Sequence, residues 1–162
     1  MKILTIRGKN LASLEGEFML DFTREPLASA GIYAITGPTG SGKSTILDAL
    51  CLALFARSPR QAAARESGVE LRDGEAGSVT PGDCRTILRK GSTEGVAAVT
   101  FAGPGGTPWE AEWSVRRARN RPSGKLQDYA LRLTNLATGQ PWPGTKTEIL
   151  RETERLVGLT YD

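Results

Sequence analysis

The chain contains no histidine and only two cysteines among its 162 residues. Without histidine it cannot build a Ser-His-Asp triad, a Cys-His dyad or an HExxH zinc site. Cys51 and Cys84 are too few for a zinc cluster. Because no secretory signal precedes them, we expect both to be reduced thiols. A metal ion used by this protein is therefore expected to be a hard cation held by oxygen atoms.

Long hydrophobic runs and targeting signals are also lacking. The longest apolar stretch, Ile46–Ala56, is interrupted by Asp48 and is too short to cross a bilayer. The N-terminal residues have neither the apolar core nor the small-residue cleavage site of a signal peptide. The sequence therefore favours a cytoplasmic protein without membrane contact.

Composition places the chain among ordinary globular domains. Hydrophobic residues make up 39% and charged residues 24%, which argues against wholesale disorder. The length predicts one domain, or part of a larger one. The formal net charge is +3, and 15 of the 21 cationic residues are arginine. Arginine binds two phosphate oxygens at once, so this usage is compatible with phosphate contacts. It is equally compatible with a GC-rich genome.

The most informative motif is a complete Walker A pattern. Gly-x-x-x-x-Gly-Lys-Ser follows a short apolar run at residues 31–36 and precedes a helical pattern from Lys43 to about Ala56. Glycines let such a loop curl so that its N–H groups point inward, at the positive end of the following helix. The lysine would reach the β- and γ-phosphates of ATP, and Ser44 would bind Mg²⁺. The predicted nucleotide site consists of Gly37, Pro38, Thr39, Gly40, Ser41, Gly42, Lys43, Ser44 and Thr45.

Around this motif the pattern predicts an α/β fold. Residues 31–36 are expected to form a buried central strand, and the Walker A helix, apolar almost all round, is expected to be buried. Residues 57–83 lack periodicity and are expected to form a long, mobile loop. We further predict a hairpin of strands 1–7 and 17–22 that turns at Gly16. An antiparallel meander is predicted over residues 95–102, 109–119 and 127–136. The last predicted element is a helix over residues 145–157, with Gly158 at its C-cap.

Other ATPase motifs are missing. After Ser44 no run of four apolar residues ends in aspartate, so the chain has no Walker B strand, and no catalytic residue is assigned. Asp48 is expected either to support the metal ligands from behind or to have a structural role, rather than to bind Mg²⁺ itself. Three functions remain open: the nucleotide-binding lobe of a larger ATPase, a small P-loop kinase, and a nucleotide-gated binding module. A kinase should carry an arginine-rich lid and a second acidic motif, and the predicted meander fits it poorly.

Several segments together resemble the N-terminal part of the SbcC family, the SMC-like ATPase subunits of bacterial SbcCD nucleases. These segments are Met1–Leu14, Asp21–Pro26, Ala34–Thr45, Leu47–Phe55, Arg117–Gln127 and Leu156–Asp162. The resemblance implies a P-loop, ABC-type head lobe over residues 1–162, with a mixed central sheet and an additional antiparallel sheet. It would be the incomplete half of a head whose C-terminal lobe supplies the signature motif, Walker B and catalytic glutamate.

The same resemblance implies ATP and Mg²⁺ as cofactors and four partners: the C-terminal lobe, a second head that closes on ATP, an SbcD-like metal-dependent nuclease, and double-stranded DNA ends. One departure concerns Ala12, which stands where many relatives carry an arginine that contacts phosphate. Arg7 and Lys9 are candidate replacements, or simply solvated charges.

A basic segment is the second candidate site. Alternation along a strand would place Arg117, Arg119 and Arg121 on one face and Arg116 on the other, and Lys125 follows in the next turn. Such a cluster could contact DNA phosphates without reading bases, or could simply keep an exposed sheet soluble. Trp109 and Trp113 are predicted to share a face of this strand, where they and Trp142 pack rather than stack on bases.

Overall fold

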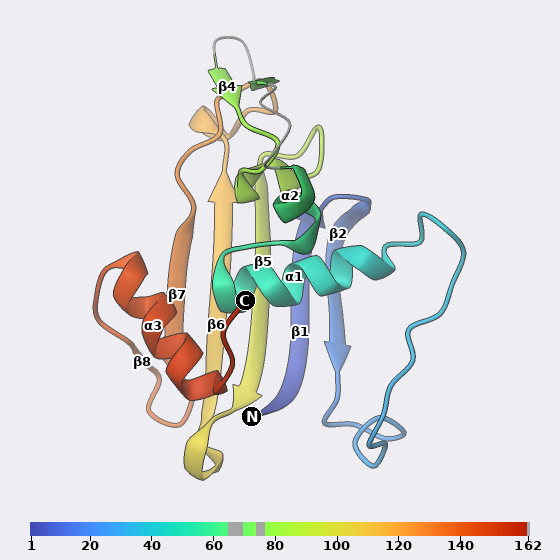
Figure 1. Ribbon diagram of the computed structural model, residues 1–162, viewed down its shortest axis with the longest axis vertical. Coiled ribbons are helices and arrows are strands. Elements are labelled where there is room, and N and C mark those ends of the chain that lie inside the picture. Colours follow the sequence, from blue (N-terminus) through green and yellow to red (C-terminus); the bar gives the residue numbers. More distant parts are fainter. Residues whose placement is uncertain (65–69, 74–76, 162) are drawn as a thin grey trace.

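The first two strands carry their more buried residues on one face. In β1 (Lys2–Leu11) the side chains of Ile6 and Leu11 are buried, and the strand pairs on both edges. One neighbour is β2 (Leu14–Asp21) and the other is β5 (Glu94–Ala102). The computed structural model describes residues 1–64, 70–73 and 77–161. In it the large sheet has the order β2-β1-β5-β6-β7-β8, with every neighbouring pair antiparallel (Figure 1).

The predicted meander is confirmed. After β5 come β6 (Pro108–Arg116), β7 (Ala130–Asn135) and the short β8 (Gln140–Pro141), and the 3-10 turns η3 (Pro104–Gly106) and η4 (Ala118–Asn120) flank β6. Along β6 every second residue is buried, so Trp109 and Trp113 share the inner face as expected. Trp142 lies edge-on to Trp109 at a centroid distance of 6.2 Å.

Two helices cover the inner face of the sheet (Figure 1). α1 (Lys43–Phe55) packs across β1, β5 and β6, and α3 (Lys146–Val157) packs against α1 and β7. The prediction for α3 is confirmed to its ends, because Thr145 and Glu148 form a capping box and Gly158 adopts φ 72° at the C-cap. α1 is less buried than predicted: its Leu47 side chain is 51% exposed.

The first hairpin turns earlier than predicted. The chain reverses at residues 12–13 rather than at Gly16, which lies inside β2. Asn10 and Ala12 take left-handed φ values of 52° and 45°, and the strand register shifts between Lys9 and Leu11. The Asn10 side chain accepts a hydrogen bond from the Gly16 amide at 2.9 Å. A short side chain that bonds to local backbone thus makes the turn that the glycine was expected to make.

The region predicted as one long loop contains regular structure. Residues 57–83 include α2 (Pro59–Ala64) and a hairpin of β3 (Leu71–Asp73) and β4 (Gly77–Val79), and η2 (Cys84–Ile87) follows. The predicted mobility falls partly on residues 65–69 and 74–76, which lie outside the described residues. No helix in the described parts of the chain is long and apolar enough to span a membrane.

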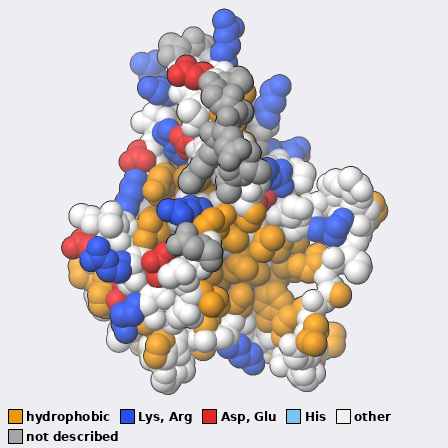
Figure 2. Space-filling view, in the orientation of Figure 1, with side chains coloured by type: hydrophobic (Ala, Val, Ile, Leu, Met, Phe, Trp, Pro, Cys, Tyr) orange, Lys and Arg blue, Asp and Glu red, His pale blue; other side chains and the backbone are white. Residues whose placement is uncertain are grey.

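The prediction of a buried strand at residues 31–36 is wrong. This segment has no regular structure, and the Ile32 and Ile35 side chains are 92% and 52% exposed. A buried parallel strand needs neighbours on both edges, and none of the described strands pairs with this segment. The mixed central sheet that this strand would have formed is therefore not present among the described residues. Apolar side chains lie exposed at the surface beside α1 (Figure 2).

Candidate functional site

The loop between the exposed segment and α1 has the backbone that its glycines predict. Gly37, Gly40 and Gly42 have φ values of 154°, 85° and 92°, in the region that side-chain-bearing residues rarely adopt. Ser41 donates its backbone N–H to the Pro38 carbonyl at 3.2 Å, which closes a tight turn. The loop therefore curls back onto the first turn of α1.

The N-terminus of α1 carries no side-chain cap. Gly42 is the N-cap residue and has no side chain with which to accept from the helix amides. The first N–H groups of a helix have no partners within the helix, and together with the helix dipole they favour an anion. No acidic residue lies in the first turn of α1. This end of the helix can thus hold a phosphate group.

Lys43 lies across the loop that precedes it. Its ammonium donates to the carbonyl oxygens of Gly37 and Pro38, each at 2.7 Å, and to Ser41 Oγ at 3.4 Å. An ammonium group has three donors and no acceptor, so the loop satisfies it fully. The lysine is therefore held at the opening of the loop, where a phosphate bound by the helix amides would meet it.

Two hydroxyl residues follow Lys43 in different surroundings. Ser44 is exposed, whereas Thr45 is only 1% exposed and its Oγ1 lies 3.4 Å from Ser13 Oγ in the turn between β1 and β2. Among the residues that the structure describes, no cluster of three Cys, Asp or Glu residues could hold a metal ion. An Mg²⁺ ion here would depend on the Ser44 hydroxyl, phosphate oxygens and water, which are the oxygen ligands it prefers.

Asp48 has a structural role, which is one of the two roles expected for it. The residue is 2% exposed and accepts a hydrogen bond from Ser58 Oγ at 2.5 Å. Its other oxygen lies 2.9 Å from Arg60 Nη2, an ion pair without hydrogen-bond geometry. These contacts tie α1 to the start of α2 and occupy the carboxylate.

Sequence reasoning missed Arg89. Its guanidinium donates to the carbonyl oxygens of Ala12 and Ser13 at 3.3 and 3.0 Å and to Glu15 at 3.1 Å. The side chain thus holds the turn that contacts Thr45, beside Ala12. Arg7 and Lys9, the candidate replacements, instead form ion pairs with Glu110 and Glu94 on the sheet. Arg89 is revealed by contacts with residues 74–77 positions away in sequence, and no local pattern signals it.

The basic segment does not follow the predicted alternation. β6 ends at Arg116, and the chain then turns through η4, where Arg119 has a left-handed φ of 58°. Arg117 points inward: its side chain is 14% exposed and pairs with the buried Asp73 at 2.7 Å. The assignment of Arg117 to an exposed face is therefore wrong, because a buried carboxylate holds its charge. The exposed members of the predicted set are Arg116, Arg119, Arg121 and Lys125.

Comparison with known proteins places this geometry in a family. Residues 5–152 match the AAA domain family. Three SbcC subunits of SbcCD nucleases align with almost the whole chain: 48% identity in Pseudomonas aeruginosa, 44% in Rhodobacter capsulatus and 29% in Deinococcus radiodurans. These alignments cover 98–100% of this chain, which spans only 13–14% of the length of those relatives. The curled glycine loop and uncapped helix therefore lie in a P-loop domain, and the chain belongs to the AAA domain family.

Proposed function

We propose that the chain binds ATP and Mg²⁺ through residues 37–45, as one lobe of the ATPase head of an SbcCD-type DNA nuclease in the cytoplasm. The observation that carries this proposal is the loop itself, which joins three left-handed glycines to an uncapped helix N-terminus beside Lys43. The similarity to SbcC proteins over nearly the whole chain supports the wider assignment.

Each part of the loop has a defined task in this proposal. The α1 amides hold the phosphates, Lys43 exchanges the Gly37 and Pro38 carbonyls for β- and γ-phosphate oxygens, and Ser44 contributes its hydroxyl to Mg²⁺. Bound Mg²⁺ neutralises charge on the phosphates. Arg89 positions the turn at residues 12–13 against Thr45 and so supports the helix start.

Turnover is expected to need a second lobe. No Walker B strand follows the loop in this sequence. We propose that a C-terminal lobe supplies the missing motifs, that two heads close on ATP, and that an SbcD-like nuclease cuts double-stranded DNA ends. The DNA contacts are proposed for the exposed cations Arg116, Arg119, Arg121 and Lys125.

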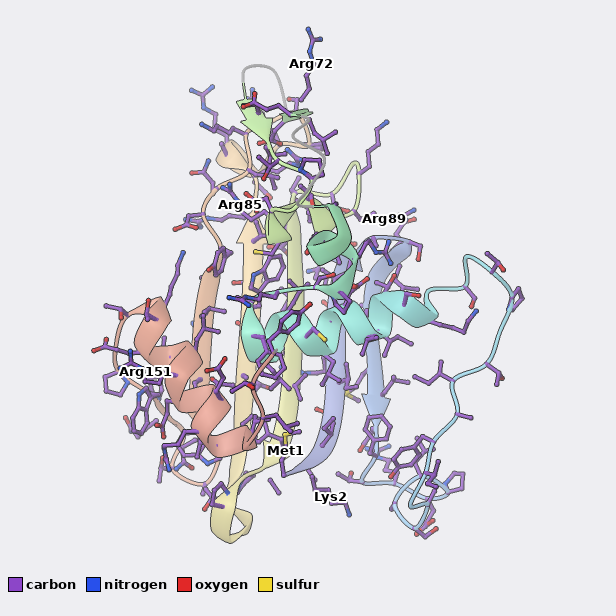
Figure 3. All side chains as sticks on the ribbon, in the orientation of Figure 1. Met1, Lys2, Arg72, Arg85, Arg89 and Arg151 are labelled. Carbon is purple, nitrogen blue, oxygen red and sulfur yellow. The ribbon has the colours of Figure 1, made fainter. Side chains whose placement is uncertain are left out.

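Nucleotide titration tests the central claim. The purified chain is titrated with a fluorescent ATP analogue and Mg²⁺, beside Lys43→Ala and the control Lys2→Ala, which removes an exposed charge at the start of β1 (Figure 3). Charged hydrogen bonds contribute about 1.5–3 kcal/mol each, so Lys43→Ala should weaken binding by roughly 10- to 150-fold. Lys2→Ala should bind like the parent. Equal binding by all three proteins would overturn the proposal.

A second assay separates the ATPase lobe from a kinase. The chain alone should hydrolyse ATP negligibly, and activity should appear when a matching C-terminal lobe is added. Robust turnover by the chain alone would favour the kinase interpretation instead.

A further inference from the structure

The β3–β4 hairpin is attached to the end of the large sheet by a buried ion pair. Asp73, the last residue of β3, is 4% exposed. One carboxylate oxygen accepts from Arg117 Nη1 at 2.7 Å, and the other accepts from the Leu126 backbone N–H at 2.7 Å. A hairpin of three-residue strands is marginal by itself, so contacts of this kind are needed to hold it in place.

Arg117 joins the hairpin to the turn that follows β6. The same Nη1 atom also donates to the Gly124 carbonyl at 2.7 Å. β4 also packs closely against the turn beside the ion pair. Gly77 in β4 lies so near the Lys125 side chain that a Cβ atom added to the glycine would be 3.3 Å from it. β3, β4 and residues 117–126 are therefore one packed unit, which we call the tip.

Exposed positive charge collects on the tip. Exposed cations come from the hairpin, from the end of β6 and from the turn: Arg72, Arg116, Arg119, Arg121 and Lys125. None of these five forms an ion pair with a residue that the structure describes. Arg72 extends away from the body of the molecule (Figure 3), and cationic side chains gather at this end of the surface (Figure 2). Glu70, just before β3, adds one exposed negative charge.

We propose that the whole tip is one binding surface for the phosphate backbone of duplex DNA, that Arg72 is one of its contacts, and that Asp73 and Arg117 are its positioning residues. This inference rests on the proposed DNA function and extends it to the hairpin. Exposed arginines suit phosphates, which they contact without reading base sequence. The buried pair presents Arg72 beside the turn arginines while placing little charge of its own on the surface.

The test measures binding of a fluorescent blunt-ended DNA duplex by anisotropy at several salt concentrations. Each phosphate contact contributes about 0.9 to the slope of log K against log salt. Arg72→Gln should weaken binding and reduce that slope by about 0.9. The control Arg151→Gln, which removes an exposed charge on α3 (Figure 3), should change neither quantity.

Asp73→Asn gives the sharper result. This substitution removes a negative charge, so simple electrostatics predicts tighter DNA binding. Positioning predicts weaker binding and a reduced slope. Asparagine has one acceptor oxygen where Asp73 uses two, so the bond from Arg117 or from the Leu126 N–H is lost together with the charge, and the hairpin is held less firmly. Circular dichroism confirms that the variant is folded, and if it is not, Arg72→Gln decides the matter.

The outcomes separate the two proposals. Failure of the parent chain to bind duplex DNA at low salt would overturn the DNA function itself. Binding by the parent that is unchanged in Arg72→Gln, or that is equal or tighter in folded Asp73→Asn, would overturn only the role of the hairpin.

Discussion

Replacing Gly42 by alanine should destabilise the domain for two separable reasons. At φ 92° a side chain strains the backbone, which costs roughly 1–2 kcal/mol. A Cβ atom at this position would also lie 2.5 Å from Leu14 Cδ2 and 2.9 Å from Leu14 Cγ. Overpacking of this kind costs typically about 1–3 kcal/mol. Gly42→Ala should therefore lower the free energy of unfolding by about 2–5 kcal/mol.

Two further variants separate the strain from the clash. Gly40 has a similar φ of 85°, but a Cβ atom there would meet nothing within 4 Å, so Gly40→Ala should cost only the backbone strain. In a Leu14→Ala background the clash disappears, and Gly42→Ala should then cost no more than Gly40→Ala does. Urea denaturation followed by circular dichroism measures all of these variants beside the parent. The reasoning is refuted if Gly42→Ala and Gly40→Ala are equally destabilising in the parent, or if Leu14→Ala leaves their difference unchanged.

Three smaller predictions concern the capping box and a half-buried thiol. Thr145→Ala removes the hydroxyl cap of α3 and should cost about 1 kcal/mol in thermal unfolding, whereas Thr147→Ala on the exposed side of the same turn should be near neutral. The backbone N–H and then the hydroxyl of Thr145 hold the pKa of Glu148 below its ordinary 4.5. Glu148 should therefore stabilise the fold fully above pH 4.5 and lose this effect as the pH falls through its lowered pKa; an NMR titration in which its pKa is 4.5 or higher would contradict this. Burial, followed by the nearby Asp83 charge, raises the pKa of the Cys84 thiol from 9.0 to about 11. At pH 8 its alkylation by iodoacetamide should be roughly 100-fold slower than that of an ordinary cysteine, and an equal rate by mass spectrometry would contradict the burial.

The local features of the site could be predicted from the sequence because their causes are local. The Walker A glycines set their own backbone angles, and alternation in β6 put Trp109 and Trp113 on one face. The ends of α3 are set by Thr145 and Gly158, which cap the helix through contacts with residues only a few positions away in the sequence. In each case neighbouring residues supply the interactions that determine the structure.

Features that depend on distant residues could not be predicted in this way. Residues 31–36 have the composition of a buried strand, but burial also requires neighbouring strands, and composition does not reveal whether these exist. Arg117 was expected to face solvent because the alternation of residues along a strand gives no information about Asp73, which lies 44 residues earlier in the sequence. Arg89 was overlooked for the same reason, since its partners at residues 12 and 13 lie in the first hairpin.

The position of β1 in the sheet has a consequence for synthesis on the ribosome. β1 is hydrogen-bonded on its second edge by β5, where Ile6 pairs with Val99, and α1 packs on β1, β5 and β6 together. When residues 37–55 leave the exit tunnel, β1 is the only part of the surface that anchors their helix to have emerged, because β5 and β6 follow later in the sequence. The nucleotide loop should therefore acquire its native shape only after β6 has emerged, and until then the nascent chain exposes the apolar side of α1 to chaperones.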